Sequence, residues 1–190
     1  GGRGLGQAYA VEAARLGAKV VAGDVLDCGE TIRLIKADGG QAIGLELDVT
    51  KMGTVSAMAE SAVEVFGGIN VLINNAAIFS QITMAPFWEL PVDEWKRAVD
   101  VNVNGAFLCS RAAVHPMIEA KWGRIINVSS GTMMMGRPNY LHYITTKAAM
   151  IGMSRSMARE VGPYGITVNT FWPGVMQTEV ERPSVPREMF

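Results

Sequence analysis

Short apolar segments alternate with longer helical segments along nearly the whole chain, and this alternation constrains the fold more than any other feature. The segments expected to form strands are short and rich in β-branched residues, and they cover residues 18–23, 42–47, 69–73, 124–128 and 166–171. The segments expected to form helices cover residues 7–16, 30–37, 52–66, 93–119 and 140–161. Because each helical crossover returns the chain in the same direction, the pattern predicts an α/β fold with a three-layer, doubly wound parallel sheet.

The size and composition favour one folded domain over residues 1–190. A chain of 190 residues can bury one sizeable core, and an apolar content of 49% is too high for a disordered chain. The net charge of -1 argues against a nucleic-acid partner, which needs a basic surface. Cys28 and Cys109 lack the spacing of a metal site. With no long apolar span and no leader visible, we expect no membrane partner and a cytoplasmic location.

Both ends of the sequence look cut. The chain starts without Met inside a glycine-rich segment, whereas a glycine loop that opens a helix normally follows a buried strand. We therefore expect that the first strand and the C-terminal end are missing, and that the natural chain is heavier.

The glycine-rich segment at the start of the chain has the character of a phosphate-binding loop. Gly2, Gly4 and Gly6 precede a helical segment, so backbone N–H groups at the helix start can approach a pyrophosphate. Taken alone the signal is weak, because glycine clusters also form ordinary turns.

Asp24 bears on the choice between NAD and NADP. It ends the strand of residues 18–23, about twenty residues after the loop, where a carboxylate accepts hydrogen bonds from the adenosine ribose. The same carboxylate repels a 2′-phosphate, which favours NAD. Arg3 in the loop could attract that phosphate, so NADP stays open.

Tyr143 and Lys147 are four residues apart and share one face of the expected helix. A neighbouring ammonium stabilises a phenolate, which makes tyrosine usable as an acid and base near neutral pH. Such a pair also arises by chance as a helix-surface contact. Ser130 follows the strand of residues 124–128, where a parallel sheet binds its ligands, and can hydrogen-bond a substrate oxygen. We expect its neighbour Ser129 to be structural.

Six motifs occur together in a fixed order. They are the glycine loop, Asn74-Asn75-Ala76-Ala77, Asn102-Val103-Asn104-Gly105, Ser130, Tyr143 with Lys147, and Pro173-Gly174 followed by Thr178. As an ordered set they resemble the compact branch of the short-chain dehydrogenase/reductase family, from residue 1 to about residue 178. The resemblance implies a Rossmann-like fold and an NAD(P)-dependent oxidoreductase that interconverts a secondary alcohol and a ketone.

The resemblance also implies roles for four residues. Tyr143 would be the acid and base, Ser130 would orient the substrate oxygen, and Lys147 would bind the nicotinamide ribose and tune Tyr143. Asn102 would hold a water in a proton relay.

The same resemblance implies which residues bind the cofactor. Asp48 would meet the adenine amino group, Asn74 to Ala76 would lie along the adenosine ribose, and Met176 and Thr178 would meet the carboxamide. Asp48 alternatively caps the following helix. The implied cofactor-binding set is Gly2, Arg3, Gly4, Leu5, Gly6, Asp24, Asp48, Val49, Asn75, Ala76, Ala77, Tyr143, Lys147, Pro173, Gly174, Met176 and Thr178. Ala77 departs from the family, which usually has glycine there.

The sequence constrains the identity of the substrate less than it constrains the type of reaction. Ile78, Phe79 and the methionines after Ser130 favour a hydrophobic alcohol or ketone, and a core position for those methionines is equally open. The alternatives are a 3-oxoacyl thioester reductase, a sugar or polyol dehydrogenase, an epimerase of the extended branch, and a dinucleotide sensor or scaffold without catalytic activity. In the family the segment after Thr178 forms a lid over the substrate, and residues 179–190 of it are present.

The resemblance further implies a homotetramer or homodimer formed through helices at about residues 104–119 and 146–161. His142 beside Tyr143 is a minor candidate for substrate contact, and His115 is expected to be structural. No metal site is expected.

Overall fold

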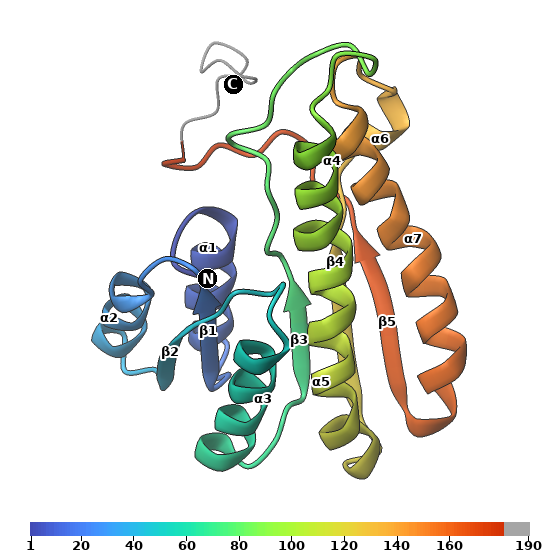
Figure 1. The fold of residues 1–190 in the computed structure, drawn as a ribbon. Helices are drawn as coiled ribbons and strands as arrows, with labels where there is room; N and C mark the ends of the chain where they lie inside the picture. The colour runs from blue at the N-terminus through green and yellow to red at the C-terminus, as the bar shows by residue number, and fades with distance from the viewer. Residues whose placement is uncertain (181–190) are drawn as a thin grey trace.

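Helices and strands alternate along the computed structural model, which describes residues 1–180 (Figure 1). The expected part of the substrate lid in residues 181–190 lies outside the described residues. The strands are β1 (Val20–Asp24), β2 (Ala42–Glu46), β3 (Val71–Asn74), β4 (Gly123–Val128) and β5 (Ile166–Phe171). The helices are α1 (Gly4–Arg15), α2 (Gly29–Ala37), α3 (Met52–Phe66), α4 (Val92–Val99), α5 (Gly105–Glu119), α6 (Thr132–Met135) and α7 (Leu141–Val161).

The strands are parallel, as predicted, and they pair in two groups. β1 pairs with β2, and β4 pairs with β3 on one side and β5 on the other. Within residues 1–180, no ladder joins β1 to β3; in Figure 1, β1 lies beside α1 and α2, and β3 lies between α3 and α5. The alternation of elements predicts the direction of the strands, whereas it does not specify which strands are neighbours.

A π-helical turn interrupts the long helical segment expected at residues 93–119. α4 continues through a π-helix at Asp100–Asn104 into α5. π-helical turns of this kind widen a helix locally and occur often at functional sites. This one carries Asn102 on its buried side.

Each sheet has its own apolar core. One core joins α5, β4 and β5 through Met117, Ile125 and Ile166, and α7 packs against it. Another joins α1, α2 and β2 through Ala10, Ile35 and Ala42. A third, around Val55 of α3, connects the region after β2 to α5. The strands are therefore held in place from their sides, and their carboxyl ends point toward a common edge.

Candidate active site

A cleft of about 1290 Å³ lies at the carboxyl ends of the strands, and both sheets contribute to its wall. Most of the predicted site residues line this cleft: Arg3, Gly4, Leu5, Asp24, Asp48, Val49, Asn75, Ala76, Ala77, Ser130, Tyr143, Lys147, Pro173, Gly174, Met176 and Thr178. Gly2, Gly6 and Asn102 do not line it. The cleft is larger than a typical small-molecule pocket, so a dinucleotide and a substrate can share it.

Lys147 is held deep in the cleft wall by the end of β4. Its side chain is only 4% exposed, and its Nζ donates a hydrogen bond of 2.7 Å to the carbonyl oxygen of Val128. Burial lowers the pKa of Lys147 to about 8, because a desolvated ammonium is disfavoured. The hydroxyl of Ser129 donates to the Lys147 carbonyl oxygen at 2.6 Å, so Ser129 has the structural contact that we expected.

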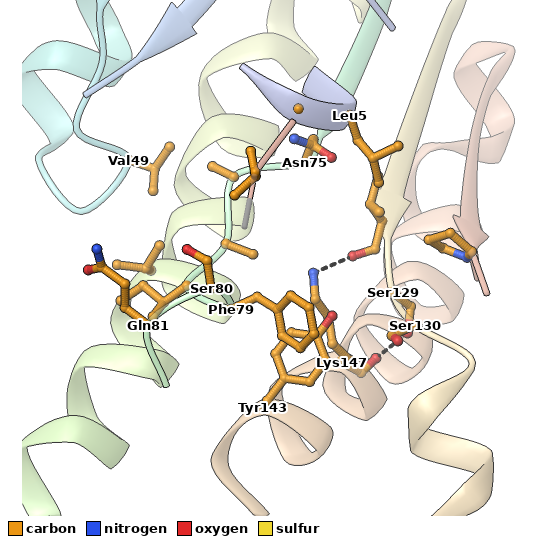
Figure 2. Close-up of a pocket in the computed structure, with 18 of the residues that line it drawn as sticks. Leu5, Val49, Asn75, Phe79, Ser80, Gln81, Ser129, Ser130, Tyr143 and Lys147 are labelled. Atoms are coloured by element: carbon orange, nitrogen blue, oxygen red, sulfur yellow. Dashed lines mark hydrogen bonds between the residues drawn. The ribbon is translucent and has the colours of Figure 1, made fainter. Parts of the chain in front are cut away.

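Tyr143 lies beside Lys147, one turn earlier on α7. The Nζ of Lys147 is 5.8 Å from the centroid of the Tyr143 ring. The ring of Phe79 lies against Tyr143 with a centroid distance of 4.5 Å and an angle of 34°. Figure 2 shows these three side chains together in the cleft. Phe79 was expected only as part of an apolar surround; its contact with Tyr143 joins residues too far apart for a local pattern to reveal.

Ser130 follows β4 and faces the same part of the cleft. Its hydroxyl donates to the Thr132 hydroxyl at 2.9 Å and accepts from the Thr132 backbone N–H at 3.2 Å. A hydroxyl rotates readily about its C–O bond, so the proton can be redirected to a substrate oxygen.

Asn102 lies behind the cleft wall, where it fixes the segment after β3. Its side-chain oxygen accepts from the Ile78 N–H at 2.7 Å, and its side-chain nitrogen donates to the Thr146 hydroxyl at 3.0 Å. The Thr146 hydroxyl donates in turn to the carbonyl oxygen of Tyr143. The Asn102 amide therefore connects α7 to the residue before Phe79. That it holds a water in a proton relay stays a prediction.

In the glycine loop, neighbouring groups lie so close to the backbone at the start of α1 that they leave little room for side chains. A Cβ on Gly2 would lie 2.7 Å from the Asp27 carbonyl oxygen, and one on Gly6 would lie 3.0 Å from the Asn75 side chain. Gly4 has a φ of 58°, a left-handed conformation that favours glycine. Its backbone N–H donates at 2.6 Å to a carboxylate oxygen of Glu179. The start of α1 thus already holds an anion, which fits a pyrophosphate-binding role.

Two carboxylates lie toward the β1–β2 end of the cleft. Asp24 accepts from the Gly2 N–H at 2.9 Å and the Leu26 N–H at 3.1 Å. These backbone N–H groups donate to the charged carboxylate and favour it over the protonated form. Asp24 is therefore ionised at neutral pH.

Asp48 accepts from the hydroxyl of Thr50 at 2.6 Å and from its N–H at 3.0 Å, and it pairs with Lys51. These contacts form a turn before α3, so the capping alternative for Asp48 is supported alongside its position in the cleft wall.

Asn74 is not among the cleft residues, in contrast to the expectation that it lies along the ribose. Its side-chain nitrogen donates to Ser110 at 3.0 Å and to Asn127 at 2.8 Å, which ties β3 to α5 and β4. The alternation of side chains along a strand explains the difference, because Asn74 is the last residue of β3 and faces inward.

His142 does not reach the cleft wall. It is fully buried, and its Nε2 lies 3.2 Å from a carboxylate oxygen of Glu94. The same oxygen accepts from the Thr83 N–H at 2.6 Å. This pairing fixes the segment between β3 and α4, and sequence reasoning missed it because its members are dispersed along the chain.

Within residues 1–180, the helices are too short or too polar to cross a membrane. The same residues hold no cluster of three His, Cys, Asp or Glu side chains suited to a metal ion.

The sequence matches the short chain dehydrogenase family over residues 1–188. It is 40% identical to a 3-alpha-(or 20-beta)-hydroxysteroid dehydrogenase of Mycobacterium tuberculosis over 191 residues, which are 100% of this chain and 71% of that protein. It is 34% identical to a 3-oxoacyl-[acyl-carrier-protein] reductase of Synechocystis, covering 94% of this chain and 72% of that protein. The chain belongs to the short-chain dehydrogenase/reductase family.

A solved structure of NAD+-bound xylitol dehydrogenase is similar in fold, with a TM-score of 0.86 and 32% identity over 91% of this chain and 66% of that one. The Rossmann-like fold is thereby confirmed. Membership of this family makes the chain an NAD(P)-dependent oxidoreductase that acts on CH–OH groups.

Proposed function

We propose that this short-chain dehydrogenase interconverts a hydrophobic secondary alcohol and its ketone, with Tyr143 as the acid and base. One observation carries the proposal: Ser130, Tyr143 and Lys147 line one part of the cleft, at the carboxyl end of β4. The cleft extends from there to Asp24 and the start of α1, where an extended dinucleotide would lie.

The chain's own residues supply the proton and the alignment. The Tyr143 hydroxyl gives a proton to the ketone oxygen during reduction and takes it back during oxidation. The Ser130 hydroxyl donates to the same oxygen and fixes its direction. At pH 7, Lys147 is largely protonated because its pKa is about 8, so its positive charge stabilises a phenolate on Tyr143.

The proposed cofactor-binding residues are the members of the implied set that line the cleft. Gly2 and Gly6 do not line it, but they shape the glycine loop. A pyrophosphate would take the position at the Gly4 N–H that the Glu179 carboxylate holds in this structure. Pro173, Gly174, Met176 and Thr178 would contact the nicotinamide end. When bound, the nicotinamide supplies or accepts a hydride.

NAD is the proposed cofactor rather than NADP. The ionised Asp24 carboxylate, which lines the cleft, repels a 2′-phosphate. Support also comes from the similar xylitol dehydrogenase, which was solved with NAD+.

The relatives and the lining of the cleft together indicate a class of substrate. Phe79 and Met135 line the cleft with apolar surface, which suits a hydrophobic alcohol and agrees in character with the hydroxysteroid dehydrogenase. A 3-oxoacyl thioester reductase remains the second candidate, favoured by the similarity to the Synechocystis reductase.

We propose further that the enzyme is one catalytic domain, assembles into a homotetramer or homodimer through α5 and α7, and works in the cytoplasm. The two free, buried thiols of Cys28 and Cys109 agree with a reducing compartment.

A panel of ketones and alcohols, assayed with NAD(H) and NADP(H) by the absorbance of the reduced nicotinamide, tests the proposed function. The full-length protein should reduce apolar ketones with NADH and oxidise the matching alcohols with NAD. Binding of NADH without turnover of any member of the panel would favour the sensor alternative.

A further inference from the structure

The segment of residues 78–84, here called the wall segment, follows β3 and forms the part of the cleft wall that contacts Tyr143. Phe79, Ser80 and Gln81 of this segment line the cleft, and the ring of Phe79 lies against the ring of Tyr143 (Figure 2). The wall segment belongs to no helix or strand. Its position therefore depends on hydrogen bonds from neighbouring elements.

Side chains from two helical elements hold the ends of the wall segment. At one end, the Ile78 N–H donates to the side-chain oxygen of Asn102 in the π-helix at 2.7 Å. At the other end, the Thr83 N–H donates to the carboxylate of Glu94 on α4 at 2.6 Å. Phe79 lies between these two bonds, so the loss of either one would free one end of the wall.

His142 of α7 fixes the orientation of the Glu94 carboxylate. His142 is fully buried, and its Nε2 lies 3.2 Å from the same Glu94 oxygen that accepts from Thr83. Burial raises the pKa of Glu94, but the Thr83 hydrogen bonds and the nearby His142 outweigh it and lower the pKa below its ordinary value. The carboxylate is therefore ionised at neutral pH and can only accept, so the His142 Nε2 is the donor. The other ring nitrogen, Nδ1, has no hydrogen-bond partner within residues 1–180.

Tyr143 is held in place by contacts that do not involve this donor. One turn further along α7, the carbonyl oxygen of Lys147 accepts from the Ser129 hydroxyl, and its Nζ donates to the Val128 carbonyl oxygen. These two bonds tie α7 to the end of β4. Loss of the bond to Glu94 would therefore free the wall segment while Tyr143 keeps its place.

We propose that His142 is a positioning residue that acts through Glu94: its buried N–H holds the carboxylate on the wall segment and thereby fixes the place of Phe79. This inference rests on the proposed function, in which the substrate carbonyl lies at Tyr143. Because the wall segment borders the cleft beside Tyr143, the pair determines how well bulky ketones are aligned. A small ketone is oriented mainly by the hydroxyls at its oxygen, whereas a bulky apolar ketone also depends on Phe79.

Replacing His142 with Leu removes the donor and keeps an apolar side chain in the buried position. On the full-length enzyme with NADH, kcat/KM for a bulky apolar ketone should fall by about tenfold or more, because a small displacement of a positioning group costs a large factor in rate. For a small ketone such as butanone, kcat/KM should fall by less than about threefold. His142→Gln, whose amide can donate to Glu94, should restore most of the activity toward the bulky ketone.

Glu94→Leu should reproduce the effect of His142→Leu, whereas Glu94→Gln keeps an oxygen for both donors and should stay close to the wild type. The double variant with Leu at both positions should lose no more than the worse single variant, because both changes remove the same contact. Glu60→Leu is the matched control, since Glu60 is exposed on α3 and does not line the cleft. It should leave both ketones unaffected.

All rates are expressed per NADH-binding site, so a lower yield of folded protein does not count as a loss. An equal loss for small and bulky ketones would overturn the proposal, because it would indicate general damage to the fold. Unchanged kinetics in a less stable His142→Leu enzyme, or losses that multiply in the double variant, would overturn it as well.

Two measurements without turnover separate this proposal from the proposed function. A long-range proton–nitrogen NMR spectrum of the wild-type enzyme at neutral pH should show a proton on Nε2 of His142; a ring protonated only at Nδ1 would overturn the proposal. Amide hydrogen exchange in the wall segment should be faster in His142→Leu than in the wild type and should return toward the wild-type rate in His142→Gln. Both results without turnover of any ketone would reject the proposed activity alone. Turnover of ketones with equal exchange in all three proteins would reject only the positioning role.

Discussion

Lys147 lies over the ring of Tyr143, with its Nζ 5.8 Å from the ring centroid and hydrogen-bonded to the Val128 carbonyl oxygen. The bond ties α7 to the end of β4, so the two side chains keep a fixed relation to each other and to the strand. The Tyr143 hydroxyl and the Lys147 ammonium are therefore held at fixed positions relative to β4.

Replacing Tyr143 with Phe should lower kcat by about 100-fold or more, because it removes the acid and base. The Kd for NADH, measured by fluorescence titration, should change little, since the ring and its contact with Phe79 remain. Tyr164→Phe, on the exposed turn after α7, is the control and should be fully active. Activity of the Tyr143→Phe enzyme within about tenfold of the wild type would show that another group carries the proton.

Replacing Lys147 with Met should abolish turnover and change how stability depends on pH. The folded-state pKa of about 8 is below the ordinary value of 10.5, so between these pH values the unfolded chain binds more protons and wild-type stability rises with pH. The free energy of unfolding of the variant, relative to wild type, should therefore fall by about 2–3 kcal/mol from pH 7 to pH 10. Urea titrations of the cofactor-free proteins at both pH values measure this. Parallel pH profiles would mean that Lys147 titrates normally.

Replacing Asp24 with Asn should shift the cofactor preference toward NADP. The amide keeps an oxygen for the Gly2 N–H and removes the negative charge that repels a 2′-phosphate. We expect the ratio of kcat/KM for NAD to that for NADP to fall by about tenfold or more. Asp38→Asn, on the exposed end of α2, should leave the ratio unchanged. A wild-type enzyme that prefers NADP would contradict the assignment.

Replacing Glu179 with Gln should tighten dinucleotide binding. Its carboxylate accepts from the Gly4 N–H at the start of α1, where the pyrophosphate would lie, so the two anions compete for the same position. Removal of the charge should lower the Kd for NAD by about two- to fivefold, measured by calorimetry at low salt. Glu89→Gln serves as an exposed control. An unchanged or weaker affinity would mean that Glu179 does not compete.

Local sequence patterns were sufficient to predict the helices and strands and much of the candidate site. A spacing of four placed Tyr143 and Lys147 on one face of α7, and the rule for parallel sheets placed Ser130 at the same cleft. The pairings of Glu94 with His142 and of Asn102 with Thr146 were not predictable in this way. Each joins side chains on different helices, and their meeting depends on how those helices pack.

The order of the strands in the sheet also could not be predicted from the sequence pattern. Alternation indicates that strands run parallel, but each strand can take several neighbours, and hydrogen-bond pairing decides among them. The pairing of β4 with both β3 and β5 is visible only in three dimensions.

The extent of the cleft has a consequence for the stability of the protein. Asp24 and Asp48 lie at its β1–β2 end, and Tyr143 and Lys147 lie at the other, so a dinucleotide along the cleft would touch both ends. A ligand that binds only the folded arrangement of these two ends opposes unfolding by its own binding free energy. The coenzyme would then act as a clamp, and its removal would increase amide hydrogen exchange in the elements at both ends.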